Sequence, residues 1–199
     1  MYSQHQPMIQ NYARTSITNW NHTATFVVAT IRIRLVEAVE AHTKLVKTGS
    51  INPRVFFGFK NSSLDYLNSF EGHNCARWAL AEDNPATVVA IYSRIPGLDI
   101  VKAGFLATLT HGVGGCLDSH NIKLYNLKPR SFRTHHKMLW DTRLAHADRY
   151  IKLCDKLGGT EKIWDNWCSH IAAKYPQTYK DGGEVSQFHT HYIEEPPAF

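Results

Sequence analysis

A chain of 199 residues is long enough to bury one sizeable hydrophobic core, or one core with an appended helical lobe. Hydrophobic residues make up 43% of the chain and charged residues 20%, which is typical of an ordinary globular protein. Lys and Arg number 22 against 17 Asp and Glu, which gives a net charge of +5. This surplus favours a polyanionic partner such as nucleic acid but does not establish one.

The cysteine, histidine and apolar patterns exclude several classes of protein. The four cysteines are scattered and form no C-x-x-C pair, so we expect buried thiols in a reducing compartment. The histidine pairs at 135–136 and at 189 and 191 each lack a third ligand, so no metal and no cofactor is expected. No run of about 18 apolar residues exists, and residues 1–20 lack the apolar core of a signal peptide. The sequence therefore predicts a soluble cytoplasmic protein.

The amino-terminal part of the chain divides by composition. Residues 1–22 are rich in Gln, Asn, Ser and Thr and are predicted to form an irregular arm. Residues 23–199 are predicted to form a single helical domain. In its first element the apolar residues recur at helical spacing until Gly49, which indicates one long helix. A strand over residues 26–33 is the alternative, because that segment is rich in β-branched residues.

Shorter helices are expected in the next segment, over residues 63–70 and 74–81 and from Asn84 onward. Asn84 is a favourable helix cap, and a proline follows it at the first helical position. Just before these helices, Phe56, Phe57 and Phe59 cluster around Gly58. They are either core residues or a surface on which a nucleobase stacks, and the sequence leaves both open.

We expect the rest of the chain to pack around the segment of residues 94–121. Pro96-Gly97 forces a tight turn between two helices, the second of which runs over about residues 99–109. A glycine-rich break at 112–115 follows. Asp118 then stands at the expected start of the next helix.

Two long helices are predicted in the carboxy-terminal part. The first covers residues 140–157 and ends at a pair of glycines. Thr160 is predicted to cap the second, whose apolar face includes Ile163, Trp164 and Trp167. A short helix is expected over residues 184–190. The predicted fold class is therefore all-α.

Two motifs carry a resemblance to a known family. Ile95-Pro96-Gly97-Leu98, with Ala103, and Leu117-Asp118-Ser119-His120 follow each other with twenty-one residues from Gly97 to Asp118. In order and spacing they resemble the helix-hairpin-helix superfamily of DNA glycosylases, whose motifs read roughly L-P-G-V-G-x-K-x-A and V-D-T-H. The resemblance implies a helix-hairpin-helix glycosylase-like fold and a DNA repair hydrolase that flips a base out of double-stranded DNA. The spacing of the cysteines cannot supply the iron–sulfur cluster that some relatives carry.

The hairpin is expected to contact the DNA backbone, because helix amides after a glycine turn can approach a phosphate. The residues predicted to bind DNA are Pro96, Gly97, Leu98, Asp99, Val101, Lys123, Lys128 and Arg130. Asp99 departs from the family, since it replaces the second glycine of the hairpin and is itself a good helix cap. Lys102 stands one residue beyond the position of the lysine nucleophile of bifunctional relatives. A shift of one residue turns a helical side chain by about 100°, so a mechanism without that lysine is favoured over a catalytic Lys102.

Asp118 is the expected catalytic carboxylate, although its sequence context also fits a plain helix cap. In the catalytic role it would stabilise an oxocarbenium-like sugar and position a water. His120 and Asn121 are expected to orient Asp118 or to pack beneath it. The aromatic candidates for a base-stacking pocket are Phe56, Phe57, Tyr125 and Trp140.

Three functions are compatible with these residues. The first is a monofunctional DNA N-glycosylase that acts on a modified or damaged base. The second is a bacteriophage thymidine-hypermodification enzyme, a glutamyl/putrescinyl-thymine pyrophosphorylase or amino acid:DNA transferase, built on the same scaffold. The third is a non-catalytic helix-hairpin-helix module. The expected partner is double-stranded DNA, without a membrane, for a monomer in the cytoplasm, or in the host cytoplasm if the protein is viral.

Overall fold

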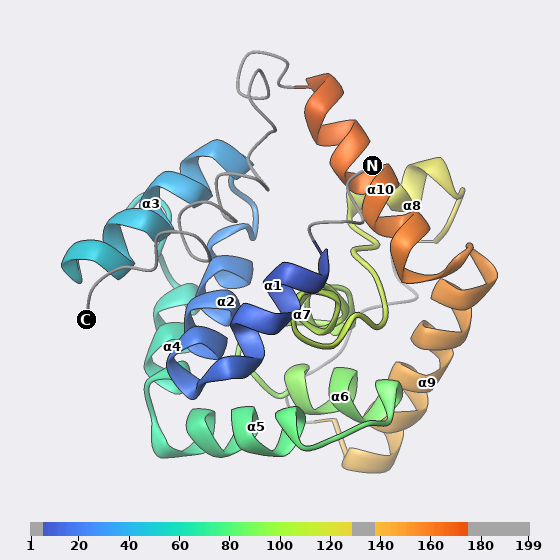
Figure 1. The fold of residues 1–199 in the computed structure, drawn as a ribbon, viewed down its shortest axis with the longest axis horizontal. Helices are drawn as coiled ribbons and strands as arrows, with labels where there is room; N and C mark the ends of the chain where they lie inside the picture. Colours follow the sequence, from blue (N-terminus) through green and yellow to red (C-terminus); the bar gives the residue numbers. More distant parts are fainter. Residues whose placement is uncertain (1–5, 129–137, 175–199) are drawn as a thin grey trace.

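A computed structural model describes residues 6–128 and 138–174, and within these residues the chain forms ten α-helices and no strand (Figure 1). The helices are α1 (Gln6–Thr15), α2 (Ile17–Ala29), α3 (Leu35–Thr48), α4 (Phe59–Leu67), α5 (Phe70–Leu80), α6 (Pro85–Tyr92), α7 (Ile100–His111), α8 (Ser119–Leu124), α9 (Trp140–Lys156) and α10 (Gly159–Lys174). The described part of the chain thus confirms the all-α class.

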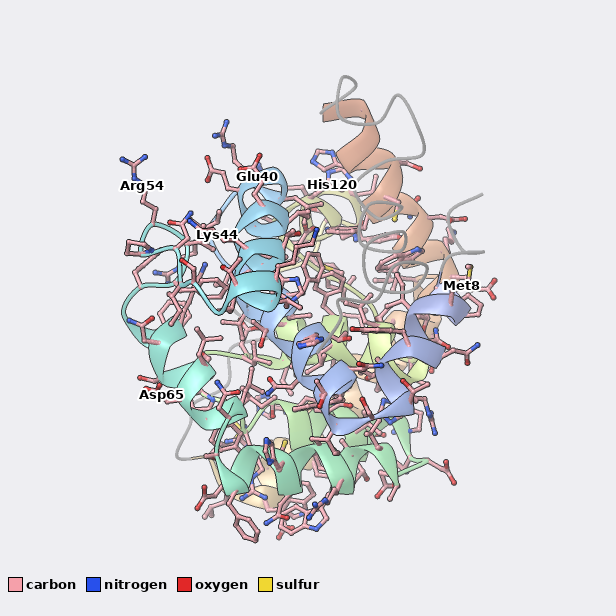
Figure 2. All side chains as sticks on the ribbon, turned by 60° about the vertical axis from the view of Figure 1, so that its left-hand side comes forward. Met8, Glu40, Lys44, Arg54, Asp65 and His120 are labelled. Carbon is pink, nitrogen blue, oxygen red and sulfur yellow. The ribbon has the colours of Figure 1, made fainter. Side chains whose placement is uncertain are left out.

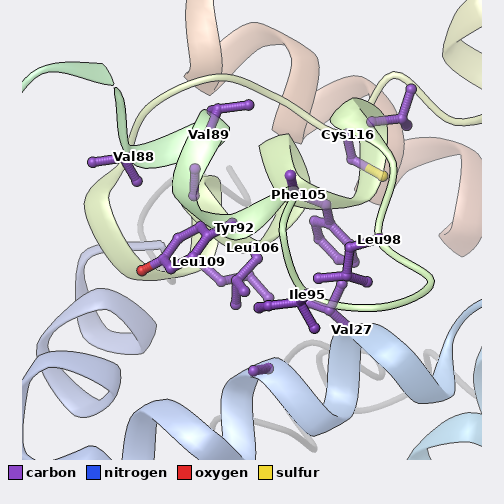
Figure 3. Close-up of a cluster of buried hydrophobic side chains, with 14 of the residues drawn as sticks. Val27, Val88, Val89, Tyr92, Ile95, Leu98, Phe105, Leu106, Leu109 and Cys116 are labelled. Atoms are coloured by element: carbon purple, nitrogen blue, oxygen red, sulfur yellow. The ribbon is translucent and has the colours of Figure 1, made fainter. Parts of the chain in front are cut away.

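Helix α7 runs through the centre of the molecule and is seen end-on in Figure 1. Helices α1, α2, α6 and α9 pack against it. The side chains of residues 103–110 are all buried, so this helix presents no solvent face over that span. Figure 3 shows side chains of α6 and α7, and of the turn that joins them, meeting in one hydrophobic cluster.

The predicted irregular arm over residues 1–22 is wrong for residues 6–15, which form α1, and for residues 17–22, which belong to α2. Ile9, Tyr12 and Ala13 are buried, and their i, i+3 and i+4 spacing places them on one face of the helix. Ser16 then caps α2 by accepting a hydrogen bond from the Asn19 amide at 3.0 Å. The mostly polar composition of this segment gave no sign that these three residues form an apolar stripe, which is sufficient for α1 to pack against the core.

The single long helix predicted up to Gly49 is also wrong, and so is the alternative strand over 26–33. Helix α2 ends at Ala29, and α3 begins at Leu35. Between them Arg32 adopts a left-handed backbone conformation with φ 58°, which a helix cannot accommodate. No glycine or proline marks this break, so local sequence signals give no warning of it.

The predicted helices over 63–70 and 74–81 exist with shifted boundaries. Helix α4 ends at Leu67, and α5 begins at Phe70 after the capping residue Ser69. Gly72 does not separate two helices but lies within α5. A Cβ atom there would lie 2.1 Å from the Tyr66 carbonyl oxygen, so glycine permits the close approach of α4 and α5.

The expected start at Asn84 is confirmed, since its side chain accepts a hydrogen bond from the Thr87 amide at 3.0 Å. Helix α9 is confirmed as well. Thr160 is not a cap, because α10 already begins at Gly159, and its hydroxyl instead donates to the Gly114 carbonyl at 2.9 Å. The helix predicted over 184–190 lies outside the described residues.

The four cysteines are buried and form no disulfide, as expected. Within residues 6–128 and 138–174, no helix is both long and apolar enough to cross a membrane.

Candidate functional site

The turn between α6 and α7 has the geometry that its sequence predicts. The Leu98 amide donates to the Ile95 carbonyl at 3.0 Å, with Pro96 and Gly97 at the two central positions. Gly97 has φ 81°, as a type II turn with a central Pro-Gly pair requires. Ile95 and Leu98 are buried, so the turn is anchored in the core at both ends (Figure 3).

Two side chains of helix α4 contact this turn and hold it in place. The Ser63 hydroxyl donates to the Pro96 carbonyl at 2.6 Å. The Phe59 ring packs so closely that a Cβ atom on Gly97 would lie 2.5 Å from its Cδ2 atom. A side chain at position 97 would therefore displace either the turn or the ring.

Asp99 caps α7, one of the two roles considered for it. Its Oδ1 atom accepts a hydrogen bond from the Lys102 amide at 3.0 Å. One amide of the first turn of α7 is therefore occupied by a carboxylate.

Asp118 is held by hydrogen bonds to both of its carboxylate oxygens. Oδ1 accepts from the amides of His120 and Asn121, each at 3.0 Å, so Asp118 caps α8. Oδ2 accepts from the indole Nε1 of Trp167 on α10, at 3.1 Å. Asn121 is fully buried and donates through Nδ2 to the Cys116 carbonyl at 2.7 Å, which secures the loop beneath. These bonds fix the orientation of the carboxylate.

The turn and Asp118 line the same cleft, which has a volume of about 970 Å³. The other walls come from the α2–α3 break (residues 30–35), the start of α7, the start of α8, and Trp167 with His170 of α10. This volume lies within the range of small-molecule sites, about 300–1,000 Å³. We call this space the cleft.

Positive charge predominates around the cleft. Its basic lining residues are Arg32, Arg34, Lys102 and Lys123, and its carboxylates are Asp99 and Asp118. With neutral histidines the formal charge of the lining is therefore +2. Arg34 also forms an exposed ion pair with Glu37 of α3, which takes up part of its charge. The cleft therefore favours an anionic ligand.

Arg32, whose backbone conformation is left-handed, lines one wall of the cleft. Its guanidinium carbon lies 5.7 Å from the centroid of the Phe59 ring, within the range of a cation–π contact. Non-glycine residues with positive φ are uncommon and are often found at functional sites. The break between α2 and α3 thus places a cation and an aromatic ring next to the hairpin turn.

Lys102 lines the cleft as well, contrary to the expectation that its side chain turns away. Its Nζ donates to the Thr30 hydroxyl at 3.1 Å and lies 5.4 Å from the Phe105 ring centroid. Next to it, the fully buried Lys60 donates to the Ala29 carbonyl at 2.9 Å. Burial, and secondarily the nearby Lys102 charge, lower the pKa of Lys60 to about 8. The two lysines therefore secure consecutive residues at the end of α2.

Two histidines stack at the rim of the cleft. The rings of His120 on α8 and His170 on α10 have centroids 3.4 Å apart and an interplanar angle of 13°. Figure 2 shows His120 near the top of the molecule, beside α10. The stack joins the short α8 to the much longer α10 and so supports the segment that carries Asp118.

The four aromatic residues predicted to line the pocket do not line the cleft. Phe56 is only 2% exposed and belongs to a separate apolar cluster against α2 and α3. Phe57 is exposed, and its ring contacts the Lys60 ammonium. The Tyr125 hydroxyl accepts a hydrogen bond from Asn166 on α10. Trp140 lines a second cavity elsewhere.

The predicted DNA-binding residues are divided in the same way. Gly97, Asp99, Val101 and Lys123 line the cleft. Pro96 lies on the turn itself, and Leu98 is buried. Lys128 is exposed but lies outside the cleft. Arg130 lies outside the described residues.

Among the cleft residues that sequence reasoning did not assign to the site are Phe59, Trp167, His170, Arg32 and Arg34. Phe59 follows Gly58 in the aromatic cluster and had a local signal, but its neighbours were chosen instead. Trp167 was assigned to the apolar face of its helix, which is correct. Its indole N–H nevertheless reaches a carboxylate 49 residues away, and no local pattern encodes that contact.

Among the described residues, no group of three or more His, Cys, Asp or Glu side chains could hold a metal ion. The histidines at 135, 136, 189 and 191 lie outside those residues. Comparisons of the chain with protein-family models, with curated proteins and with solved structures found no match.

Proposed function

We propose that the cleft receives a nucleotide flipped out of double-stranded DNA and that the protein cleaves its N-glycosidic bond, as the helix-hairpin-helix glycosylases that its motifs resemble do. One observation carries the proposal. The Gly97 turn and Asp118, which lie twenty-one residues apart in the sequence, line the same cleft. A turn that grips the DNA backbone and a carboxylate that acts on the sugar must be neighbours in this mechanism.

The chemistry assigns Asp118 to the sugar. As the bond between C1′ and the base nitrogen breaks, positive charge develops on the sugar, and a fixed carboxylate stabilises that charge. The three N–H groups bound to Asp118 hold it in one orientation, so little reorganisation accompanies the reaction. The base leaves with the electrons of the broken C1′–N bond, water then attacks C1′, and the proton that this water loses passes through solvent to the departed base.

Basic side chains supply the proposed grip on DNA. Because Asp99 occupies one amide of the first turn of α7, backbone amides alone give a weaker phosphate site than an open helix end. Arg32 and Lys123 at the cleft compensate as phosphate contacts. Binding is therefore expected to weaken steeply with salt.

A second function is favoured by one specific feature, the presence of Asp99 as a second carboxylate in the cleft. A carboxylate can hold the ammonium group of an amino acid or polyamine. In the thymidine-hypermodification alternative, the amine would lose a proton to solvent and attack the methyl carbon of the base, and pyrophosphate would leave with the electrons of the broken C–O bond. The glycosidic bond would then stay intact.

Product analysis tests both functions. The protein is incubated with duplexes that contain uracil, 5-hydroxymethyluracil or its pyrophosphorylated derivative, the last with and without added amines, and the nucleosides are analysed by mass spectrometry. A free base and an abasic site support the glycosylase, whereas a heavier, intact nucleoside supports the transferase. Tight DNA binding without any product across all duplexes would contradict both and leave the non-catalytic module.

A further inference from the structure

A second cavity, of about 570 Å³, shares no lining residue with the cleft. It is lined by Tyr66, Arg94, Met138, Leu139, Trp140 and Arg143. These residues come from α4, from the segment that follows α6, and from the start of α9. In Figure 1 the start of α9 lies at the bottom of the molecule beside α5 and α6, opposite α8. We call this space the second cavity.

Two guanidinium groups converge on the second cavity, and none of its six lining residues is acidic. Arg143 is only 3% exposed, and its Nη1 donates to the carbonyl and the hydroxyl of Ser93. Burial, and secondarily the charge of Arg94, lower the pKa of Arg143. Arg94 and Arg143 line the same cavity, so its positive charge favours an anionic ligand.

The cavity also exposes flat and apolar side chains. Leu139 is 78% exposed and Trp140 is 41% exposed, at the first turn of α9. Large apolar side chains gathered at a surface commonly mark a binding site. Arg94 extends this surface, because its guanidinium lies 5.9 Å from the ring centroid of Trp78. The second cavity thus combines the guanidinium groups of Arg94 and Arg143 with the indole ring of Trp140.

The N-terminus of α9 adds to the positive potential of the cavity. Leu139 is the N-cap residue of this helix, and its side chain forms no capping hydrogen bond with the amides of the first turn. The helix is 17 residues long, and its aligned peptide dipoles place partial positive charge at this end. This charge supports the two arginines and is not by itself a site.

We propose that the second cavity binds a nucleoside phosphate, with the phosphate against Arg94 and Arg143 and the base stacked on Trp140. Guanidinium groups match phosphate oxygens in a bidentate manner. Indole rings stack on bases of any sequence. A volume of about 570 Å³ suits a ligand of this size. The proposal is independent of the reaction assigned to the cleft.

Calorimetric titration of the full chain with adenosine monophosphate tests the assignment. Arg94→Gln and Trp140→Leu alter exposed side chains, and circular dichroism verifies that each variant is folded. Arg149→Gln on α9 is the matched control, because Arg149 is exposed and does not line the cavity. We expect saturable binding that either variant weakens by about tenfold or more and that the control leaves unchanged.

Inorganic phosphate and adenosine, titrated separately, distinguish the parts of the ligand, and each should bind more weakly than the nucleotide. The proposal would be overturned by the absence of saturable binding, or by phosphate binding as tightly as the nucleotide. It would also be overturned if Arg32→Gln in the cleft, rather than Arg94→Gln, abolished binding.

Discussion

Replacing Gly97 by alanine is expected to destabilise the fold much more than the same change at Gly49. Both glycines have a positive φ, 81° and 68° respectively, so alanine is strained at either position. The left-handed conformation costs alanine about 1 kcal/mol or somewhat more. The two positions differ in their surroundings: nothing lies within 4 Å of a Cβ atom at Gly49, whereas one at Gly97 would lie 2.5 Å from Phe59.

The steric conflict sets the expected difference. Overpacking of this kind typically adds about 1–3 kcal/mol, because the ring or the turn must move. We therefore expect a loss of about 1 kcal/mol in the free energy of unfolding for Gly49→Ala and about 2–4 kcal/mol for Gly97→Ala. Urea denaturation followed by circular dichroism measures both values under a two-state analysis.

A second background isolates the contact with the ring. In a Phe59→Ala protein the ring atoms are gone and only the Ser63 hydroxyl oxygen, at 3.1 Å, remains close, so the cost of Gly97→Ala should fall toward that of Gly49→Ala. Equal costs for the two glycine changes in the wild-type background would refute the packing of Phe59 on the hairpin turn. So would a Gly97→Ala cost that the Phe59→Ala change leaves unaltered.

Three further predictions concern single side chains. His111 donates through Nε2 to a backbone carbonyl at 2.8 Å, and burial lowers its pKa to about 4. The unfolded chain therefore takes up this proton first as pH falls below about 6.5. Urea titrations should show a loss in the free energy of unfolding on the order of 1 kcal/mol at pH 5.5, and His111→Gln should not show that loss. Trp167→Phe should slow catalysis by about five- to tenfold, with little change in DNA affinity, because it removes one donor from Asp118. If the rate is unchanged, that bond does not position the carboxylate. Burial raises the pKa of Cys75 to about 11 and of Cys154 to about 12, so both thiols should react with a disulfide reagent only after denaturation, and prompt reaction of the native protein would contradict their burial.

Local sequence signals predicted the elements that depend on local chemistry. Asn84 and the Pro96-Gly97 pair each fix a cap or a turn through their own backbone preferences, and both occur where expected. Asp118 was expected at a helix start, and its capping bonds are present. Its position in a cleft beside the turn was implied only by the resemblance of the two motifs to those of a known family.

The features that sequence did not predict depend on contacts between distant residues. The break after α2 uses Arg32 in a glycine-like conformation and a buried Lys60, which donates across 31 residues to the end of the helix. Gly72 falls in the gap expected between the helices over 63–70 and 74–81, although it lies within α5 and permits the close packing of α4 and α5. The lysine that secures the end of α2 lies 31 residues away, outside any local window. The contact of Gly72 with Tyr66 is close in sequence but depends on how α4 and α5 pack, so periodicity gives no signal for either feature.

The most direct test of the central claim is single-turnover release of a base from duplex DNA by Asp118→Asn, measured beside DNA affinity. Asparagine preserves the shape of the side chain but removes its charge. Asp65→Asn, which alters an exposed carboxylate on α4 (Figure 2), is the matched control. We expect Asp118→Asn to lose about a hundredfold or more in rate with its DNA affinity retained, while the control keeps both. A variant that releases the base as fast as the wild-type protein would show that the carboxylate beside the hairpin does not carry the reaction.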